Sequence, residues 1–356
     1  KFIITLLLLY DGRISSMKLK KWHIWLGFAI SAVFLYLAFR KVDFSQVWFY
    51  LTHAQWSWVL LGLVFYFIGV WLRAFRWQIL LNPLKKLSIP RLFQVVAIGY
   101  MGNNVFIARA GEVLRAVILK DREQVPISAS LATVIVERIF DGVVMLGFVF
   151  LNLGALTHLT SDSGFIGNIR ELAVWGAVIF AAALIVFLLA AMFPHQTEKI
   201  VTLLINKFIP AKIREKTLGI ALKFLNGLES LRSPKDALMI LVTTTIIWLL
   251  ETGKYWFVMH AFNFEVSYFA LMLMNGVVNL ATTIPSAPGY IGTFDAPGIA
   301  VLAAYGVSRE VAAAYTLVLH VALWFPITLL GAYYYFRQPL RWGKNVSKAS
   351  VEEASS

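Results

Sequence analysis

Ionisable side chains lie inside or beside long apolar runs of this chain. They are Arg73, Arg76, Arg109, Glu112, Arg115, Glu137, Arg138, Asp141, Glu251 and Lys254. Placing one such side chain in hydrocarbon costs about 2.5–3.5 kcal/mol on insertion scales, so each needs a partner or a polar cavity. Arginine suits phosphate, because its planar fork donates to two oxygens at once. The set therefore indicates a cavity where arginines bind phosphate and carboxylates balance the charge.

Snorkelling and structural ion pairing are the alternatives to a cavity for part of this set. Arg73 and Arg76 lie one helical turn apart near the end of an apolar run, so they could snorkel to the membrane surface. Buried ion pairs could also serve only to hold helices together. Glu137 and Asp141 share a helix face, whereas Arg138 is expected to point elsewhere. We favour a cavity for the whole set, because the charges converge beside two broken apolar segments.

The clearest break is the apolar segment from Asn275 to Gly298, which cannot form one continuous helix. Its helix-breaking residues are Pro285, Pro288, Pro297, Gly289, Gly292 and Gly298. Broken backbone at membrane depth must be buried in protein or line a polar cavity, where transporters bind their substrates. The alternative is an extramembrane loop between two short helices, but long apolar runs flank the break.

The composition places the chain among integral membrane proteins. Of 356 residues, 59% are hydrophobic and 14% are charged, against about 25% charged in soluble domains. The chain has no cysteine, which excludes disulfides and Cys-ligated metal sites. The net charge of +13 falls in the connections between apolar runs. This distribution is typical of cytoplasmic loops beside anionic lipid and does not indicate nucleic-acid binding.

The fold class predicted is an all-α polytopic membrane protein with about six full spans and two re-entrant helical hairpins. The spans are 22–39, 56–81, 126–153, 169–193, 237–262 and 311–336. Residues 42–55 have the pattern of an amphipathic interfacial helix, and 194–235 that of a cytoplasmic amphipathic region. Residues 1–16 are interpreted as a non-native or misassigned extension, 17–343 as one transmembrane domain, and 344–356 as a disordered tail.

The two hairpins are expected near 88–124 and 266–307, related by an inverted repeat. Basic residues flank the first hairpin on both sides, so both of its ends should face the cytoplasm. With both termini cytoplasmic, the second hairpin must begin and end outside. The run Arg73-Ala-Phe-Arg76-Trp77 before the first hairpin resembles Glu251-Thr-Gly-Lys254-Tyr-Trp256 before the second. Paired interruptions of this kind indicate a transport site between the repeats, although coincidence also accounts for the sequence echo alone.

Motifs of soluble enzyme families are absent. The sequence has no H-E-x-x-H zinc pattern, G-x-S-x-G elbow, Walker A loop or dinucleotide fingerprint followed by a strand. We therefore expect no enzymatic activity, no cofactor and no metal, and we expect His320 to pack in a helix interface. A membrane-embedded lipid transferase is the alternative, since such enzymes need only scattered arginines and carboxylates near a phosphate.

Four stretches, taken together, resemble a known family. They are Arg73-x-x-Arg76-Trp77, Asn103-Asn104 leading into Arg109-Ala-Gly-Glu112-x-x-Arg115, Glu137-Arg138-x-x-Asp141, and Pro285-Ser286-x-Pro288-Gly289-x-x-Gly292. In this order they resemble the lysylphosphatidylglycerol synthase transmembrane region, a flippase-like family, over about residues 17–340. The resemblance implies a standalone flippase-like protein without the aminoacyl transferase domain of the bifunctional members. One departure is Ile107, where the family commonly has proline.

These observations predict a lipid transporter, and the resemblance implies a bacterial or archaeal cell membrane as its location. It would move a phospholipid or polyprenyl-phosphate lipid between leaflets, through a cavity between the two hairpins. The expected substrate-binding residues are the ionisable residues from Arg73 to Lys254 named at the outset, together with Asn103, Asn104, Asn279, Pro285, Ser286, Pro288, Gly289 and Gly292. Phosphate-bearing lipids are the expected partners, with a second copy of the chain or a partner enzyme as protein partners. A scaffold for a lipid-modifying enzyme, using the basic region 194–235, is a further alternative.

Overall fold

The protein is built from helices. The computed structural model describes residues 21–106, 110–152, 164–284 and 286–338, and no strand occurs in these ranges. The predictions for residues 1–16 and 344–356 lie outside the described ranges, as do Ile107, Arg109 and Pro285. The all-α polytopic membrane fold predicted from the sequence is confirmed.

Six long helices correspond to the six predicted spans. They are α2 (Lys21–Phe39), α4 (Trp56–Leu81), α7 (Ile127–Leu151), α9 (Gly164–Met192), α12 (Pro234–His260) and α15 (Arg309–Arg337). By length and composition, α4, α12 and α15 are candidate membrane spans on their own. Helices α2 and α9 reach that standard together with the bent helices that follow them. Helix α7 is as apolar as α4 but carries Glu137, Arg138 and Asp141 near its middle, which is more charge than that standard allows.

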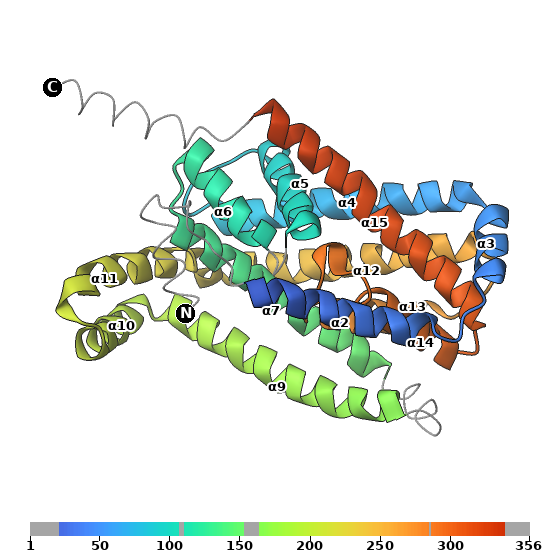
Figure 1. Ribbon diagram of the computed structural model, residues 1–356. Helices are drawn as coiled ribbons and strands as arrows, with labels where there is room; N and C mark the ends of the chain where they lie inside the picture. The colour runs from blue at the N-terminus through green and yellow to red at the C-terminus, as the bar shows by residue number, and fades with distance from the viewer. Residues whose placement is uncertain (1–20, 107–109, 153–163, 285, 339–356) are drawn as a thin grey trace.

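Amphipathic helices lie at the two ends of the bundle. Helix α3 (Phe44–His53) follows α2 at a bend of 84°, and α10 (Pro194–Phe208) follows α9 at a bend of 106°. Helix α11 (Ala211–Asn226) and the short η2 (Glu229–Arg232) then lead into α12. Figure 1 shows α3 at one end of the long helices and α10 with α11 at the other. Their orientation relative to the cytoplasm stays a prediction.

The two predicted hairpins are pairs of short helices. The first consists of α5 (Ile89–Val105) and α6 (Ala110–Glu123). The second consists of α13 (Tyr268–Ala281), η3 (Pro288–Tyr290) and α14 (Asp295–Ala304). The predicted break between Asn275 and Gly298 is present, because the helix stops at Ala281 and resumes at Asp295. Pro297 does not interrupt a helix but lies in the first turn of α14, where a missing N–H is tolerated.

The packing partners follow a twofold repeat. Within the first unit α4 packs on α5, α5 on α6 and α6 on α7, and α12 to α15 repeat these pairings. Between units, α4 packs along α12. The first helix of each hairpin contacts the last helix of the other unit: α5 contacts α15, and α13 contacts α7. The Gln55 N–H, at the start of α4, donates to the Ala261 carbonyl, at the end of α12 (3.0 Å), so the two helices are antiparallel. The repeat is therefore inverted, as predicted.

The sequence echo between the halves is in register with this repeat. Arg73 is residue 18 of α4 and Glu251 is residue 18 of α12. Arg76 and Lys254 are each residue 21 of the same two helices. The repeated positions therefore carry charges in both halves, which argues against coincidence.

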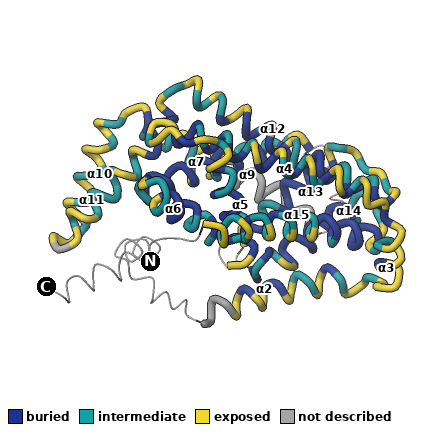
Figure 2. The backbone as a smooth tube through the Cα atoms, turned by 90° about the horizontal axis from the view of Figure 1, so that it is seen from above, coloured by how far each residue is buried: buried dark blue, intermediate teal, exposed yellow. Residues whose placement is uncertain are grey.

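Burial separates a mixed polar and apolar interior from an apolar exterior. The backbone is buried mainly where α4, α5, α7 and α12 to α15 cross, whereas α2, α3, α10 and α11 are largely exposed (Figure 2). Large apolar side chains such as Leu60, Val64 and Ile68 are exposed along α4. An exposed apolar belt around a buried polar centre is the pattern expected of a protein whose solvent is lipid.

Candidate functional site

A cavity of about 140 Å³ lies where the tips of the two hairpins meet the long helices. Its walls come from α4, α5, α6, α7, α12, α13, η3 and α15, so both halves of the repeat contribute. The lining residues are Tyr66, Arg73, Val96, Gly99, Tyr100, Asn103, Asn104, Glu112, Arg115, Arg138, Trp248, Glu251, Asn279, Thr282, Gly289, Tyr290, Phe294, His320, Leu323 and Trp324. The predicted location between the hairpins thus contains a cavity, with charged groups in its wall.

The first hairpin supplies a wall of arginines and carboxylates. Arg115 of α6 forms an ion pair with Glu137 of α7 (Nη1 to Oε2, 2.9 Å), and its guanidinium stacks on the ring of Trp77 (3.8 Å). Arg138 of α7 pairs with Glu112 of α6 (Nε to Oε1, 3.2 Å). Each helix thus supplies one arginine and one carboxylate to the interface between α6 and α7, and the two ion pairs hold both arginines beside the cavity.

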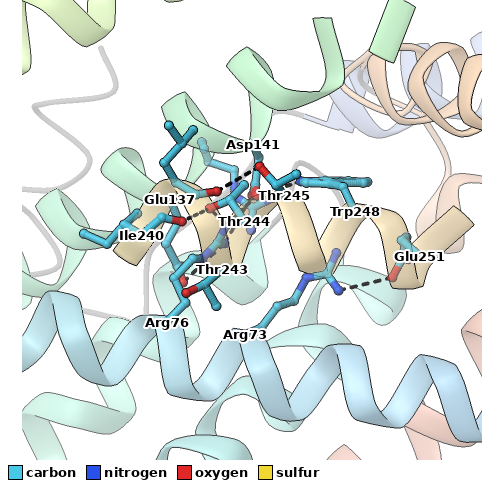
Figure 3. Close-up of polar contacts among 12 residues, drawn as sticks. Arg73, Arg76, Glu137, Asp141, Ile240, Thr243, Thr244, Thr245, Trp248 and Glu251 are labelled. Atoms are coloured by element: carbon cyan, nitrogen blue, oxygen red, sulfur yellow. Dashed lines mark hydrogen bonds and ion pairs between the residues drawn. The ribbon is translucent and has the colours of Figure 1, made fainter. Parts of the chain in front are cut away.

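A second layer of charge lies behind that wall. Arg76 is fully buried and donates from Nη1 to Asp141 Oδ1 (2.6 Å), while its Nη2 lies 3.5 Å from Glu137 Oε1. Trp248 and Thr244 complete this centre through hydrogen bonds to Asp141 and from Arg76. Figure 3 shows Arg76 between Glu137 and Asp141, and Arg73 turned toward Glu251. Arg76, Glu137 and Asp141 therefore act as a buried ion-pair centre and do not line the cavity.

The two halves meet at an ion pair of equivalent positions. Arg73 Nη1 lies 3.2 Å from Glu251 Oε2, and the second oxygen of Glu251 binds the buried Lys254 ammonium group. Lys254 also lies over the ring of Tyr66 (4.6 Å). Arg73 and Arg76 are 7% and 0% exposed, so neither side chain snorkels to the membrane surface.

The second hairpin contributes a different kind of wall. His320 of α15 contacts Asp295 of α14 (Nδ1 to Oδ1, 2.9 Å) and the carbonyl oxygen of Gly289 (Nε2 to O, 2.7 Å). Asp295 Oδ2 accepts the Gly292 N–H (2.9 Å). The sequence interpretation placed His320 in a helix interface, which is correct in part, but it missed that the ring faces the cavity. Its place in the repeat was the available signal, since His320 is residue 12 of α15 and Arg138, which also lines the cavity, is residue 12 of α7.

Aromatic side chains that the sequence analysis did not select also line the cavity. They are Tyr66, Tyr100, Trp248, Tyr290, Phe294 and Trp324. The guanidinium of Arg73 lies over the rings of Tyr100 and Trp248, at 5.9 and 5.4 Å. Such rings hold a cation in place without neutralising it, so Arg73 keeps its charge toward the cavity.

The predicted site residues divide into three groups. Those lining the cavity are Arg73, Asn103, Asn104, Glu112, Arg115, Arg138, Glu251, Asn279 and Gly289. Those packed beside it are Arg76, Glu137, Asp141, Lys254, Ser286, Pro288 and Gly292. Arg109 and Pro285 lie outside the described residues. The expectation that Arg138 points away from Asp141 is wrong, because Arg138 Nη1 reaches Asp141 Oδ2 at 3.3 Å through the length of its side chain.

The cluster has spare positive charge and spare hydrogen-bond donors. Five cations (Arg73, Arg76, Arg115, Arg138, Lys254) are paired with four carboxylates (Glu112, Glu137, Asp141, Glu251), which leaves a net charge of +1. Arg115 is 6% exposed, and its Nε and Nη2 atoms have no hydrogen-bond partner among the described residues. Buried donors without partners are costly, so this arrangement favours an anionic group in the cavity. No group of histidines and carboxylates in the described ranges is arranged to hold a metal ion.

Similar proteins come from archaea. The chain is 25% identical to the glycosyltransferase AglD of Haloferax volcanii, over 86% of the chain and 52% of that protein. It is 25% identical to the UPF0104 membrane protein MJ1078 of Methanocaldococcus jannaschii, over 66% of the chain and 92% of that protein. A UPF0104 membrane protein of Methanothermobacter thermautotrophicus is 23% identical over 78% of the chain and 83% of its own length. No solved structure is significantly similar to the chain.

One of these relatives corrects an expectation from the sequence. The absence of familiar catalytic motifs led to the prediction that the chain is not an enzyme, and the similarity to a protein named as a glycosyltransferase contradicts it. The chain spans about half the length of that relative.

The family is shown by a match over most of the chain. Residues 24–331 match the family model described as the lysylphosphatidylglycerol synthase TM region. This range includes the described helices from α2 to most of α15, and with them every residue around the cavity. The chain belongs to the family of the lysylphosphatidylglycerol synthase transmembrane region.

Proposed function

We propose that the protein moves a phosphate-bearing lipid between membrane leaflets, with the headgroup bound in the cavity between the two hairpins. The observation that carries this proposal is the pair of buried donors without partners on Arg115, a residue of the cavity wall within a cluster of net charge +1. Guanidinium donors and a phosphate form strong charge-assisted hydrogen bonds in a low-dielectric site. A phospholipid and a polyprenyl phosphate both present this group.

The inverted repeat supports movement as the function of this cavity. One hairpin enters the bundle from each end, so displacement of either tip would open the cavity toward one side only. Alternating displacement of the two hairpins would expose the headgroup to the two leaflets in turn. The acyl or prenyl chains would stay in the surrounding lipid, along the apolar exterior of the long helices.

The test is a lipid-movement assay in proteoliposomes. It follows a fluorescent phospholipid and a labelled polyprenyl phosphate, for the wild type and for Arg115→Lys. Lysine keeps the charge but loses the planar fork, so we expect movement to fall at least about tenfold, the equivalent of one lost charge-assisted hydrogen bond. Arg91→Gln is the control, since Arg91 lies on α5 but is exposed and outside the cavity. Movement unaffected by Arg115→Lys would refute the assignment of the cavity.

Transfer of a group onto a lipid phosphate is a second candidate, favoured by the relative named as a glycosyltransferase. In this reaction an oxygen of the lipid phosphate attacks the anomeric carbon of an activated sugar. The new phosphate–sugar bond forms as the bond to the leaving group breaks. Mass spectrometry of polyprenyl phosphate incubated with the purified protein and nucleotide sugars tests it. A covalent product supports transfer, whereas lipid movement without a change of mass supports transport.

A further inference from the structure

The contacts of His320 determine how many protons its ring and Asp295 hold together. Nε2 faces the Gly289 carbonyl oxygen at 2.7 Å, and Nδ1 faces Asp295 Oδ1 at 2.9 Å. A carbonyl oxygen accepts only, and each of these two short contacts needs a proton. One proton therefore lies on Nε2, and one lies between Nδ1 and the carboxylate. The pair holds two protons, whether the second is assigned to the ring or to the carboxyl group.

Loss of one proton would break a specific contact. The carboxylate of Asp295 is held in place by the Gly292 N–H (2.9 Å) and lies in the first turn of α14, where the helix dipole favours negative charge. A singly protonated ring would keep its proton toward this charge. The lone pair of Nε2 would then face the lone pairs of the Gly289 carbonyl oxygen, which is repulsive. Deprotonation should release Gly289 and leave Asp295 bound.

Gly289 links His320 to the first hairpin, because it also packs against Trp324, which contacts Asn104. Its φ of +74° is a conformation that favours glycine, and an added Cβ would lie 2.7 Å from Nε1 of Trp324. The same indole N–H donates to the carbonyl of Asn104 at the end of α5 (3.4 Å), and Asn104 Nδ2 donates to Thr328 of α15 (2.8 Å). His320, Gly289 and Trp324 thus form the junction between the two hairpin tips.

Other titratable groups near this junction are already engaged. Asp295 is the titratable group in direct contact with His320 among the described residues. Across the cavity, Arg73, Arg115, Arg138, Glu112 and Glu251 are in ion pairs with one another or with α7 and α12. The tyrosines of the lining, Tyr66, Tyr100 and Tyr290, ionise far above neutral pH in water. Histidine is the side chain whose charge ordinarily changes between pH 5 and 8.

We propose that the His320–Asp295 pair is a proton-binding site that couples protonation to the contact between the two hairpins. With two protons the pair holds Gly289 and closes the second wall of the cavity. With one proton η3 is released from α15, and the second hairpin moves away from Trp324. The proton-binding site itself does not depend on the proposed function. The inference rests on the proposed function only where it names a proton gradient as the source of energy for lipid movement.

The first experiment measures the junction and not transport. The chain has no cysteine, so spin labels can be attached at Val105→Cys and Ile291→Cys, two exposed positions on the two hairpin tips. Distances between the labels are measured by electron paramagnetic resonance at pH 5 and pH 8. We expect one short distance at pH 5 and a second, longer distance at pH 8. A one-proton linkage changes the ratio of the two populations by at most tenfold per pH unit, so about a thousandfold is the upper limit between pH 5 and pH 8. We expect a change of at least about tenfold within that limit.

Matched variants decide whether His320 is responsible. His320→Gln keeps one donor but does not titrate, and it should abolish the difference between pH 5 and pH 8. His260→Gln is the control, because His260 of α12 contacts a single backbone carbonyl, that of Trp256, and lies outside the cavity. Should His320→Gln fail to fold, Asp295→Asn serves instead, since it removes the charge that retains the proton. A pH-independent distance in the wild type, or a pH dependence that survives in His320→Gln (or in Asp295→Asn where it replaces that variant), overturns the proposal.

The second experiment separates this inference from the proposed function. Lipid movement in proteoliposomes is measured with and without a pH difference of two units across the membrane. We expect the difference to change the rate in the wild type and in His260→Gln, but not in His320→Gln. Lipid movement that ignores the pH difference would refute proton coupling and leave lipid transport intact. A pH-dependent distance without lipid movement would support the proton site and refute transport.

Discussion

The two hairpins occupy equivalent places in the repeat but are held in different ways. The first is fixed by side-chain charges: Arg115 and Glu112 of α6 bind Glu137 and Arg138 of α7. Helices α5 and α6 also touch through backbone, since an added Cβ on Gly111 would overlap the Gly99 carbonyl oxygen. Among the described residues, the second is held by backbone turns at Gly289 and Gly292, by the His320–Asp295 pair and by uncharged hydrogen bonds such as that from the Ala287 N–H to Ser31 Oγ.

This difference extends to the long helices that precede the hairpins. Arg76 and Lys254 are both residue 21 of their helix, and both are buried. Arg76 forms ion pairs with two carboxylates of the first unit, Glu137 and Asp141. Among the described carboxylates, Lys254 pairs only with Glu251, and Arg73 pairs with Glu251 as well. One half of the repeat thus carries a fixed electrostatic centre, and the other half carries contacts that can be exchanged at lower cost.

The largest expected effect comes from removing the cation at these equivalent positions. Arg76→Leu leaves two buried carboxylates with one cation fewer, and breaking a buried pair in this way costs about 3–5 kcal/mol. Lys254→Leu leaves Glu251 paired with Arg73 and should cost clearly less. The free energy of unfolding in detergent, from SDS titration, measures both.

A surface variant calibrates that comparison. Arg91 of α5 pairs with Glu123 but is 69% exposed, so Arg91→Leu should change the free energy of unfolding by less than about 1 kcal/mol. Equal losses for Arg76→Leu and Lys254→Leu would mean that the two halves are stabilised alike. The distinction between a fixed and an exchangeable half would then be wrong.

A smaller effect is expected from adding one methyl group to each hairpin. In Gly111→Ala the new Cβ would meet backbone, the Gly99 oxygen and the Asn103 nitrogen (2.6 Å), which cannot move without separating α5 from α6. In Gly298→Ala it would meet the end of the Met274 side chain (2.8 Å) and the Thr316 methyl (3.0 Å). Overpacking costs about 1–3 kcal/mol where the surroundings are rigid, and methionine adapts.

The measurement is the thermal midpoint of each variant in the same detergent. Gly111→Ala should lower it, and Gly298→Ala should lower it less. Alanine also improves on glycine within a helix, which offsets part of the clash in α14. A greater loss for Gly298→Ala would show that the second hairpin is the more tightly packed of the two.

The fold was largely predictable because membrane helices are encoded locally. Apolar runs marked every long helix, and Asn275–Gly298 marked the second hairpin through its prolines and glycines. The inverted repeat followed from the distribution of lysine and arginine, since charge bias sets orientation. The identical register of Arg73 and Glu251 was visible in the sequence, although the sequence alone did not show that they pair.

The site was less predictable, because helix rotation is not encoded locally. The sequence placed Arg73 and Arg76 on one face, but only the packing shows that Arg73 lines the cavity while Arg76 lies behind it. Asp295 and His320 are 25 residues apart and become partners only through the fold of α14 on α15. A lone histidine in an apolar helix carries no pattern that distinguishes a packed ring from a proton-binding one.

The smallest effect tests whether single hydrogen bonds between the halves matter. Thr328 and Thr316 both lie on α15, but Thr328 Oγ1 accepts from Asn104 of the first hairpin (2.8 Å), whereas the buried Thr316 Oγ1 has no partner among the described residues. Thr328→Val should therefore cost about 0.5–1.5 kcal/mol. Thr316→Val replaces an unsatisfied hydroxyl by a methyl of the same shape, so it should be neutral or stabilising. A lower free energy of unfolding in Thr328→Val, together with an unchanged or higher one in Thr316→Val, would identify Asn104–Thr328 as a stabilising contact between the halves. Equal values would mean that the Asn104–Thr328 hydrogen bond adds nothing to the junction of His320, Gly289 and Trp324.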